Sequence, residues 1–581
     1  MTIELGPRTL ALDGTSLPEK SLIGGKAWSV ARMRGLGLPV PPAFVITTQA
    51  CAEYLATGAL PAGLLDELEI GVQWLEKMTG RVLGSDRAPL LLSVRSGAMV
   101  SMPGMMDTIL NLGMNSETAV ALARETGDAA FASDTHRRFL ELYARIVLRG
   151  TLPELAADAP LANIESAIIE ATGMSVPEEP RAQLAGAVQA VFESWNSRRA
   201  RRYRDHHQIP HTLGTAVTVQ AMVFGNLDAD SGTGVLFSRN PLTGAADPFG
   251  EYLARAQGED VVSGRFTPRP LSALAESAPD IHRQLLAAAA RLEAENGDVQ
   301  DIEFTVQQGQ LYLLQTRTAK RAPAAAVRFA VDMVHEGRID EATALSRVTA
   351  EQIRVLLSPR LAPGATDDAV VVAGGEAACQ GIGTGVVVIN TDEAERRAQA
   401  GEKVILARDT TSPDDVHGML VAHAVITEQG GTTSHAALVC RDIGVPCVVG
   451  CGPGNLMALV GQVVTVDGGA GRVYAGDLSV IAPDERTEPG LAALAVWAAV
   501  RAPLQVFEEA APEAKAAQDL DRMRGGEDPE QLAALAAGAL ILRGAVLNSD
   551  KGVAAAVAAG VKAIVVKQRL PALLAALGAV K

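Results

Sequence analysis

One short segment, DIEFTVQQGQLYLLQTR, constrains the fold most strongly, because its alternation of polar and apolar residues predicts an antiparallel β-hairpin. Asp301 and Glu303 alternate with apolar residues, so the two carboxylates share one face of the first strand. We expect a three-residue turn at 307–309 with its glycine at positive φ. That turn pairs Asp301 with Gln315 and Glu303 with Leu313.

The same register places Gln315 and Arg317 on the acidic face of the hairpin. Two carboxylates, an amide and a guanidinium suit Mg²⁺ bound together with nucleotide phosphates, because Mg²⁺ prefers a few carboxylates plus phosphate oxygens. The alternative is an ordinary solvated face of an antiparallel hairpin, since such polar faces are common. Taken alone, the hairpin favours this alternative.

Glycine-rich segments with nearby basic residues recur in the first half of the chain. Lys26 directly follows the pair at 24–25, Arg95 lies near the end of a predicted strand, and two further flexible segments lie at 101–107 and 231–234. Glycines let backbone N–H groups approach phosphates, while Lys26 and Arg95 can neutralise them. None of these segments matches the P-loop pattern, and each glycine loop alone is more often a turn.

A histidine stands at a predicted helix start, where the strand-like HAVITE leads through GGTTS into AALVCRDIG. Ser434 is a good N-cap, which places His435 in the first helical turn, where free N–H groups and the helix dipole attract an anion. A phosphoryl group on the imidazole fits that position, and histidine can act as a covalent nucleophile. The alternatives are a structural histidine or a metal site with Cys440, Cys447 and Cys451, whose spacing matches no usual zinc pattern.

Length and charge exclude several classes of protein. At 581 residues the chain should hold several domains. Its formal net charge of −16 argues against non-specific binding to nucleic acid or anionic membrane, so a nucleotide site needs locally concentrated positive charge. No apolar run reaches spanning length, no signal-peptide pattern opens the sequence, and the five cysteines form no C-x-x-C pair. We therefore expect a cytoplasmic protein.

Several long stretches together resemble the pyruvate phosphate dikinase family. They lie between about residues 20 and 477 and include LIGGKAWSVARMRGLGLPVPPAFVITT, SVRSGAMVSMPGMMDTILNLG, SGTGVLFSRNPLTG, DIEFTVQQGQLYLLQTRTAKR and VITEQGGTTSHAALVCRDIGVPCVVGCG. The resemblance implies an α/β (α+β multidomain) fold, in which an ATP-grasp domain precedes a swivelling β/β/α phosphohistidine domain and a small Ala-rich C-terminal segment. It also implies transfer of the β-phosphoryl group of ATP to His435, with release of AMP, and of the γ-phosphoryl group to inorganic phosphate, which gives pyrophosphate.

The resemblance further assigns roles to single residues by motif match. His435 would carry the phosphoryl group, and Arg317 would face the phosphates as a second catalytic residue. Asp301 and Glu303 would hold Mg²⁺, with ATP as the substrate. Contacts to ATP are expected from eight residues, namely Lys26, Arg95, Gly104, Gln220, Thr233, Gly234, Glu259 and Gln315.

We expect the ATP-grasp domain at 1–325 with subdomains at about 1–213 and 214–325, a helical linker at 326–365, the phosphohistidine domain at 366–480, and an extension of unassigned role at 481–581. In the family a pyruvate/phosphoenolpyruvate barrel follows the histidine domain, and such a barrel needs about 250 residues. The residues after Asp477 are too few for it. We therefore expect the acceptor site on another chain, such as a separate barrel protein.

Two alternatives stay open. One is a complete small-molecule dikinase whose tail forms the acceptor pocket, and the other is a non-catalytic nucleotide-binding paralogue. Against the second, all the charged residues that the resemblance requires are present, whereas a relic should have lost some of them. The sequence leaves the oligomeric state open, with a homodimer as one option.

Overall fold

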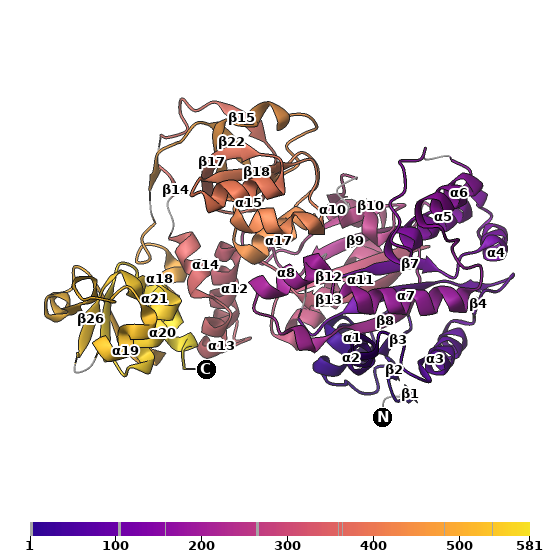
Figure 1. The fold of residues 1–581 in the computed structure, drawn as a ribbon, viewed down its shortest axis with the longest axis horizontal. Helices are drawn as coiled ribbons and strands as arrows, with labels where there is room; N and C mark the ends of the chain where they lie inside the picture. Colours follow the sequence, from indigo (N-terminus) through magenta and orange to yellow (C-terminus); the bar gives the residue numbers. More distant parts are fainter. Residues whose placement is uncertain are drawn as a thin grey trace.

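Hydrophobic segments of the chain assemble into sheets that are covered by helices and distributed over three lobes (Figure 1). The computed structural model describes residues 4–100, 102, 106–156, 159–262, 266–357, 360–362, 364–481, 483–536 and 539–580. The indigo-to-magenta lobe contains the first half of the chain, the orange lobe follows it, and the yellow lobe contains the C-terminal residues. The fold is α/β and multidomain, as the sequence predicts.

The first sheet has six antiparallel strands in the order β1-β2-β3-β8-β6-β7. All six residues of β8 are buried, because this strand lies between β3 and β6 under covering helices. The strands of the sheet therefore extend to Ala221, beyond the predicted subdomain boundary near residue 213. The strands are β1 (Glu4–Gly6), β2 (Thr9–Ala11), β3 (Ala43–Ile46), β6 (Leu92–Gly97), β7 (Thr108–Leu112) and β8 (Ala216–Ala221).

Eight helices accompany this sheet in the described part of the N-terminal lobe, and a short pair of strands, β4 (Val82–Leu83) with β5 (Pro89–Leu90), lies between α3 and β6. One large apolar core lies between the sheet and several of these helices. The helices are α1 (Lys20–Gly35), α2 (Thr48–Thr57), α3 (Leu64–Thr79), α4 (Ser116–Thr126), α5 (Ala129–Ile146), α6 (Leu161–Thr172), α7 (Pro180–Ser194) and α8 (Arg198–His206).

The second sheet has five antiparallel strands in the order β11-β10-β9-β12-β13. Its hydrophobic face packs on α1 and α11 in a core of its own. The strands are β9 (Gly232–Phe237), β10 (Phe249–Ala254), β11 (Arg269–Pro270), β12 (Gln300–Gln307) and β13 (Gln310–Thr318), and the helices are α9 (Gly258–Val262), α10 (Ser272–Ser277) and α11 (Pro279–Asn296).

The β12–β13 hairpin exists as predicted, but the predicted pairing is wrong. The turn has two residues, Gln308 and Gly309, both with positive φ (51° and 70°), so the strands pair from 307 with 310 onward. A bulge between Glu303 and Phe304 then shifts the register by one residue. As a result, Asp301 lies opposite Arg317 and Glu303 lies opposite Gln315.

The region expected to be the phosphohistidine domain, residues 366–480, is built on one eight-stranded sheet in the order β15-β22-β21-β17-β18-β19-β20-β16. Its centre, β17 to β20, is parallel, and these strands alternate with helices along the chain. The strands are β15 (Val371–Gly374), β16 (Glu376–Cys379), β17 (Ile382–Val388), β18 (Val404–Arg408), β19 (Ala424–Thr427), β20 (Cys447–Val449), β21 (Val463–Asp467) and β22 (Arg472–Ala475), and the helices are α15 (Thr391–Gln399), α16 (Val416–Val421) and α17 (His435–Ile443).

The C-terminal lobe is a small α/β module whose four parallel strands have the order β24-β27-β26-β25. The two strands β14 (Arg360–Leu361) and β23 (Val480–Ile481) pair to form a narrow neck between this lobe and the phosphohistidine domain. The strands of the module are β24 (Gln505–Glu508), β25 (Gln518–Asp519), β26 (Ile541–Arg543) and β27 (Ala563–Val566), and its helices are α18 (Pro489–Arg501), α19 (Leu532–Leu535), α20 (Asp550–Ala558) and α21 (Arg569–Gly578).

The three helices predicted as a linker belong structurally to this C-terminal lobe. They are α12 (Pro323–His335), α13 (Glu341–Ser346) and α14 (Ala350–Leu356), and one hydrophobic core contains apolar residues of all three together with those of α18, α20 and α21. The opposite side of α12, with Phe329 and Met333, packs in another cluster with Phe237. Ile353, Leu494 and Leu570 are each fully buried in it. The linker helices and the C-terminal segment therefore fold as one unit rather than as a linker and a separate tail.

We expect Leu494→Ala to destabilise α12–α14 as well as the C-terminal module, because Leu494 is fully buried in their shared core. The expected loss in free energy of unfolding is about 2–5 kcal/mol, as for other Leu→Ala changes in cores. Thermal unfolding combined with limited proteolysis of residues 323–357 measures it. Val500→Ala on the same helix is the control, since Val500 is 79% exposed. Unchanged protection of residues 323–357 in a destabilised Leu494→Ala protein would contradict the shared core.

Candidate active site

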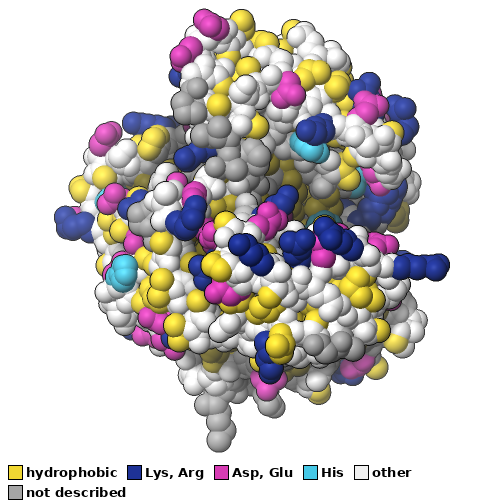
Figure 2. All heavy atoms as spheres, turned by 90° about the vertical axis from the view of Figure 1, so that its left-hand side faces the viewer, with side chains coloured by type: hydrophobic (Ala, Val, Ile, Leu, Met, Phe, Trp, Pro, Cys, Tyr) yellow, Lys and Arg dark blue, Asp and Glu magenta, His cyan; other side chains and the backbone are white. Residues whose placement is uncertain are grey.

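A cavity of about 1660 Å³ lies between the two ATP-grasp sheets and the phosphohistidine domain. Eleven Lys and Arg side chains line it against seven Asp and Glu side chains, although the whole chain carries a net charge of −16. Figure 2 shows the molecule hollowed between an upper and a lower part, with dark blue Lys and Arg side chains gathered along the hollow. The positive charge that an anionic ligand needs is thus concentrated in this cavity.

Lys26 reaches the cavity from helix α1, which is kinked just before it. Gly24 has φ 74° and ψ 165° inside the helix, and a Cβ atom there would lie 1.8 Å from the carbonyl oxygen of Gly97. The N–H of Gly25 donates to the carbonyl of Ala98 at 2.9 Å. These glycines therefore let α1 approach the end of β6. Because the N–H of Gly25 donates to Ala98, it is not available to bind a phosphate in this arrangement. Burial, followed by the repulsion of Arg95, lowers the pKa of Lys26 well below its usual value.

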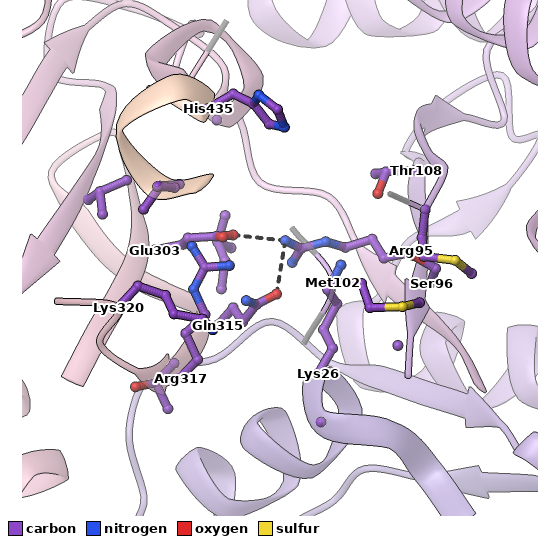
Figure 3. A pocket seen from close by; sticks show the side chains of 18 of the residues that line it. Lys26, Arg95, Ser96, Met102, Thr108, Glu303, Gln315, Arg317, Lys320 and His435 are labelled. Carbon is purple, nitrogen blue, oxygen red and sulfur yellow. Dashed lines mark hydrogen bonds and ion pairs between the residues drawn. The ribbon is translucent and has the colours of Figure 1, made fainter. Parts of the chain in front are cut away.

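Arg95 connects the two sheets of the ATP-grasp domain. Its Nη2 donates to Glu303 Oε2 at 2.8 Å and to Gln315 Oε1 at 3.5 Å (Figure 3). Burial opposes ionisation of Glu303, but Arg95, Arg317 and Lys26 together hold the pKa of its carboxyl below the usual value. Glu303 is therefore ionised at neutral pH and remains 31% exposed to the cavity.

Asp301 lies behind the cavity wall rather than in it. Its Oδ2 accepts from Arg317 Nε at 2.6 Å, while its Oδ1 is buried and has no hydrogen-bond partner within the described residues. Burial raises the pKa of Asp301, although Arg317 opposes this shift. A buried carboxylate oxygen without a partner is costly, and oxygens of this kind are ligands that Mg²⁺ accepts. Together with the exposed carboxylate of Glu303, the donor set fits a magnesium ion at this end of the hairpin.

The remaining residues predicted to contact ATP divide into three groups. Gln220, Thr233 and Gly234 line the cavity. Gln220 also donates to Pro41 O at 3.1 Å, and Thr233 donates to Phe304 O at 3.0 Å, so both side chains are held by the protein itself. Gly104 lies outside the described residues. Glu259 lies in α9, but its side chain is outside the described part.

His435 enters the same cavity from the phosphohistidine domain, at the first residue of α17 as predicted (Figure 3). Ser434 occupies the N-cap position, but its hydroxyl makes no capping bond and is buried without a partner in the described structure. Thr411 Oγ1 lies 3.2 Å from Nδ1 of His435. Nε2 is buried and unpartnered among the described atoms, and burial lowers the pKa of His435 to about 4. The imidazole is therefore neutral at physiological pH, with one nitrogen free.

Three residues of the site escaped the sequence prediction because their partners lie in other segments of the chain, and in the case of Glu251 in the other domain. Thr411 contacts the imidazole, and Arg441 lines the cavity while its guanidinium donates to the carbonyls of Ala378 and Thr432. The carboxylate of Glu251 on β10 accepts hydrogen bonds from the hydroxyls of Thr432 and Thr433, which precede His435. The segments that carry these residues belong to the stretches that resemble the family, but nothing in their local pattern indicates partners so distant in sequence.

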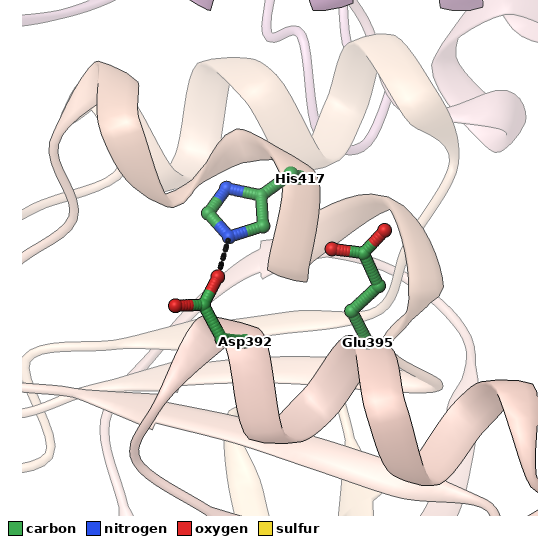
Figure 4. Close-up of side chains that lie close together, drawn as sticks. All are labelled: Asp392, Glu395 and His417. Atoms are coloured by element: carbon green, nitrogen blue, oxygen red, sulfur yellow. Dashed lines mark hydrogen bonds and ion pairs between the residues drawn. The ribbon is translucent and has the colours of Figure 1, made fainter.

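The metal site with cysteines that the sequence left open receives no support. Cys440, Cys447 and Cys451 are buried, and burial raises the pKa of Cys451 to about 12. Among the described residues, the group of three or more His, Cys, Asp or Glu side chains whose donor atoms lie close together is instead Asp392, Glu395 and His417 (Figure 4). This group lies on α15 and α16, and none of its members lines the cavity. In the described residues no helix is both long enough and apolar enough to cross a lipid bilayer.

Comparison with known families agrees with this geometry. The family model described as pyruvate phosphate dikinase, AMP/ATP-binding domain, matches residues 20–82 and 64–285. The model described as PEP-utilising enzyme, mobile domain, matches residues 400–471, which include α17 and His435. The matched regions include Lys26, Arg95 and His435 of the cavity, whereas the β12–β13 hairpin lies between the two matches.

Curated relatives extend the similarity over most of the chain. Pyruvate, phosphate dikinase of Rhizobium meliloti (strain 1021) is 42% identical over 516 residues, which cover 81% of this chain and 57% of the relative. The enzyme of Clostridium symbiosum is 41% identical over 79% of this chain and 57% of its own length, and pyruvate, phosphate dikinase 2 of Zea mays is 45% identical over 74% and 51%. The chain thus spans little more than half the length of these relatives. Through its ATP-binding and mobile domains, the chain belongs to the pyruvate phosphate dikinase family.

Proposed function

We propose that this chain transfers the β-phosphoryl group of ATP to His435 and releases AMP and pyrophosphate. The observation that carries the proposal is that His435 lines the same cavity as Lys26, Arg95 and Arg317, while its Nε2 is buried and has no hydrogen-bond partner among the described residues. A neutral imidazole nitrogen facing concentrated positive charge suits attack on a polyphosphate. A histidine with a purely structural role would gain no stability from a ring nitrogen that has no hydrogen-bond partner.

The bond changes balance in two steps. Nε2 of His435 forms a bond to the β-phosphorus, the bond from that phosphorus to the oxygen bridging the α-phosphate breaks, and AMP leaves with that oxygen. Inorganic phosphate then takes the γ-phosphoryl group, which gives pyrophosphate and leaves one phosphoryl group on His435. Both steps move charge among phosphate oxygens, so catalysis rests mainly on positioning and on neutralising that charge.

The residues around the cavity supply that neutralisation. We assign Lys26, Arg95 and Arg317 to the phosphates, and Gln315 to the orientation of Arg95. Asp301 and Glu303 would hold Mg²⁺, which when bound neutralises charge on the phosphates. Contacts to ATP from Gln220, Thr233 and Gly234 are proposed from their place in the cavity lining, and contacts from Gly104 and Glu259 from motif match alone.

For the second half of the reaction we propose an acceptor of the pyruvate class, bound on a separate barrel protein. The curated relatives are named for pyruvate and phosphate. A pyruvate enolate needs a cation held by carboxylates. A cavity of about 300 Å³ between α14 and the C-terminal module is lined by seven residues, none of them acidic: Arg354, Leu547, Asn548, Lys567, Gln568, Pro571 and Ala572. That lining does not suit the enolate.

The labelled-nucleotide experiment tests the first half-reaction. With ATP labelled at the β-phosphorus we expect an acid-labile, base-stable label on the wild-type protein, and none on His435→Asn, because the attacking nitrogen is lost. His417→Asn, a change in the same domain away from the cavity, is the control and should label normally. Label that persists on a folded His435→Asn protein would refute the assignment. The labelled protein should then lose its label to pyruvate only after a barrel protein is added.

Glu303→Gln should slow labelling of His435 by roughly 10²–10³-fold, because the change removes charge at the point where Mg²⁺ and Arg95 meet. The Mg²⁺ concentration that gives half-maximal labelling should rise, while thermal stability changes little. Glu351→Gln is the matched control, since Glu351 lies at the cavity rim with its carboxylate 73% exposed. Labelling of Glu303→Gln at nearly the wild-type rate would contradict the proposed metal face.

The pH dependence of labelling should reflect the low pKa of His435. Because burial lowers this pKa to about 4, the folded protein keeps the imidazole neutral from pH 5 to 8, and the rate should fall only as the pH approaches 4. An ordinary histidine would instead lose its nucleophile near pH 6.5. Between pH 6.5 and 4 the unfolded chain binds the extra proton, so this residue's contribution to stability declines as the pH falls. Ring ¹⁵N titration, assigned with His435→Asn, measures the pKa, and a midpoint near 6.5 would contradict its burial.

A further inference from the structure

Side chains of the ATP-grasp domain form hydrogen bonds with residues at both ends of helix α17. Ahead of its first residue, Thr432 and Thr433 donate their hydroxyls to the carboxylate of Glu251 on β10. In its last turn, Asp442 accepts from the phenol of Tyr203 at 2.7 Å and from the ammonium of Lys320. His435 lies between these two contacts, at the start of the helix.

The carboxylate of Asp442 lies at a position where its own domain does little to stabilise its negative charge. A carboxylate in the last turn of a helix lies at the negative end of the helix dipole, where cations are favoured. Both partners of Asp442 come from the other domain, since Tyr203 is in α8 and Lys320 follows β13. The side chain of Asp442 is 12% exposed, so its charge is largely withdrawn from water in this arrangement. The negative charge of Asp442 is therefore stabilised mainly by Tyr203 and Lys320 across the interface.

The two partners are suited to recognise a carboxylate. Tyr203 is 3% exposed, and burial followed by the charge of Asp442 raises the pKa of its phenol, which keeps the O–H as a donor. Lys320 lies in the cavity lining close to Arg317 (Figure 3). It stands three residues after Arg317, just beyond the end of the strand that also carries Gln315. The contact thus ties α17 to the strand that presents side chains to the phosphates.

This tie has a geometric consequence for His435. Asp442 lies seven residues along α17 from His435, about 10 Å at a rise of 1.5 Å per residue. Leu438, one turn after His435, packs in a cluster with Val235 and Phe237 of β9. Helix α17 therefore contacts the ATP-grasp domain before its first residue, in its middle and in its last turn.

We propose that Asp442 is a positioning residue that docks the phosphohistidine domain through Lys320 and Tyr203, so that His435 meets the phosphates. This inference rests on the proposed phosphorylation of His435. Asp442 touches no reacting atom in this role. Its loss should therefore slow labelling of His435 without changing the affinity for ATP.

The test is a charge reversal across the interface. Asp442→Lys and Lys320→Glu should each slow labelling of His435 on the order of 10- to 100-fold, because like charges then face each other at a partly buried contact. The double variant Asp442→Lys/Lys320→Glu should recover to within about fivefold of the wild type. Tyr203→Phe should have a smaller effect, since one neutral hydrogen bond is lost. Asp392→Lys, an exposed site on α15, is the control and should label normally.

A second measurement separates this inference from the proposed function. Small-angle X-ray scattering should show an increased radius of gyration for each single reversal and a return to the wild-type value for the double variant, whether or not any label is formed. Unlabelled wild-type protein would refute the proposed function alone. Single variants that keep wild-type labelling and scattering, or a folded double variant that recovers neither, would overturn the docking role of Asp442.

Discussion

One extra residue in β13 decides which side chains face the nucleotide cavity. The tight turn at Gln308 and Gly309 sets a pairing in which Leu314 would stand opposite Glu303. The bulge passes over Leu314 and brings Gln315 to that place, with Arg317 opposite Asp301. Since strand side chains alternate, the same hairpin without the bulge would turn Gln315 and Arg317 away from both carboxylates. The ion pair between Arg317 and Asp301 and the hydrogen bond from Arg95 to Gln315 both depend on this one-residue shift.

The electrostatics of the site follow from that placement. Arg95, Arg317 and Lys26 lie close enough to Glu303 to keep its carboxylate ionised. Burial, followed by the repulsion of Arg95 and Arg317, lowers the pKa of Lys26. A polyphosphate would relieve this repulsion, so the site favours a strongly anionic ligand. His435 contributes no charge of its own, because burial keeps it neutral. A neutral nucleophile can approach the cationic cavity without repulsion.

The sequence predicted the parts of this site that depend on local pattern. Alternation around Asp301 and Glu303 predicted a shared acidic face, and the helix start after GGTTS predicted the place of His435. The register was wrong, because neither a two-residue turn nor a bulge can be recognised from alternation alone. Docking contacts such as that of Asp442 join residues more than a hundred positions apart, for which a single sequence holds no signal. For the same reason the shared core of the linker helices and the C-terminal module was missed.

The neck formed by β14 and β23 makes the contacts on α17 important for the position of the phosphohistidine domain. The phosphohistidine domain is joined to the C-terminal lobe through β14 and β23, two strands of two residues each, which resist rotation weakly. Its docked position must then be stabilised by the interface itself. A partly exposed ion pair contributes about 0–1 kcal/mol and a hydrogen bond about 1 kcal/mol. These contacts act together with apolar packing across the interface, where Leu438 lies in one cluster with Val235 and Phe237 and Trp195 lies in another with Met419. If the domain leaves the cavity after phosphorylation of His435, as the proposed function requires, this combined stabilisation must be small enough to be released.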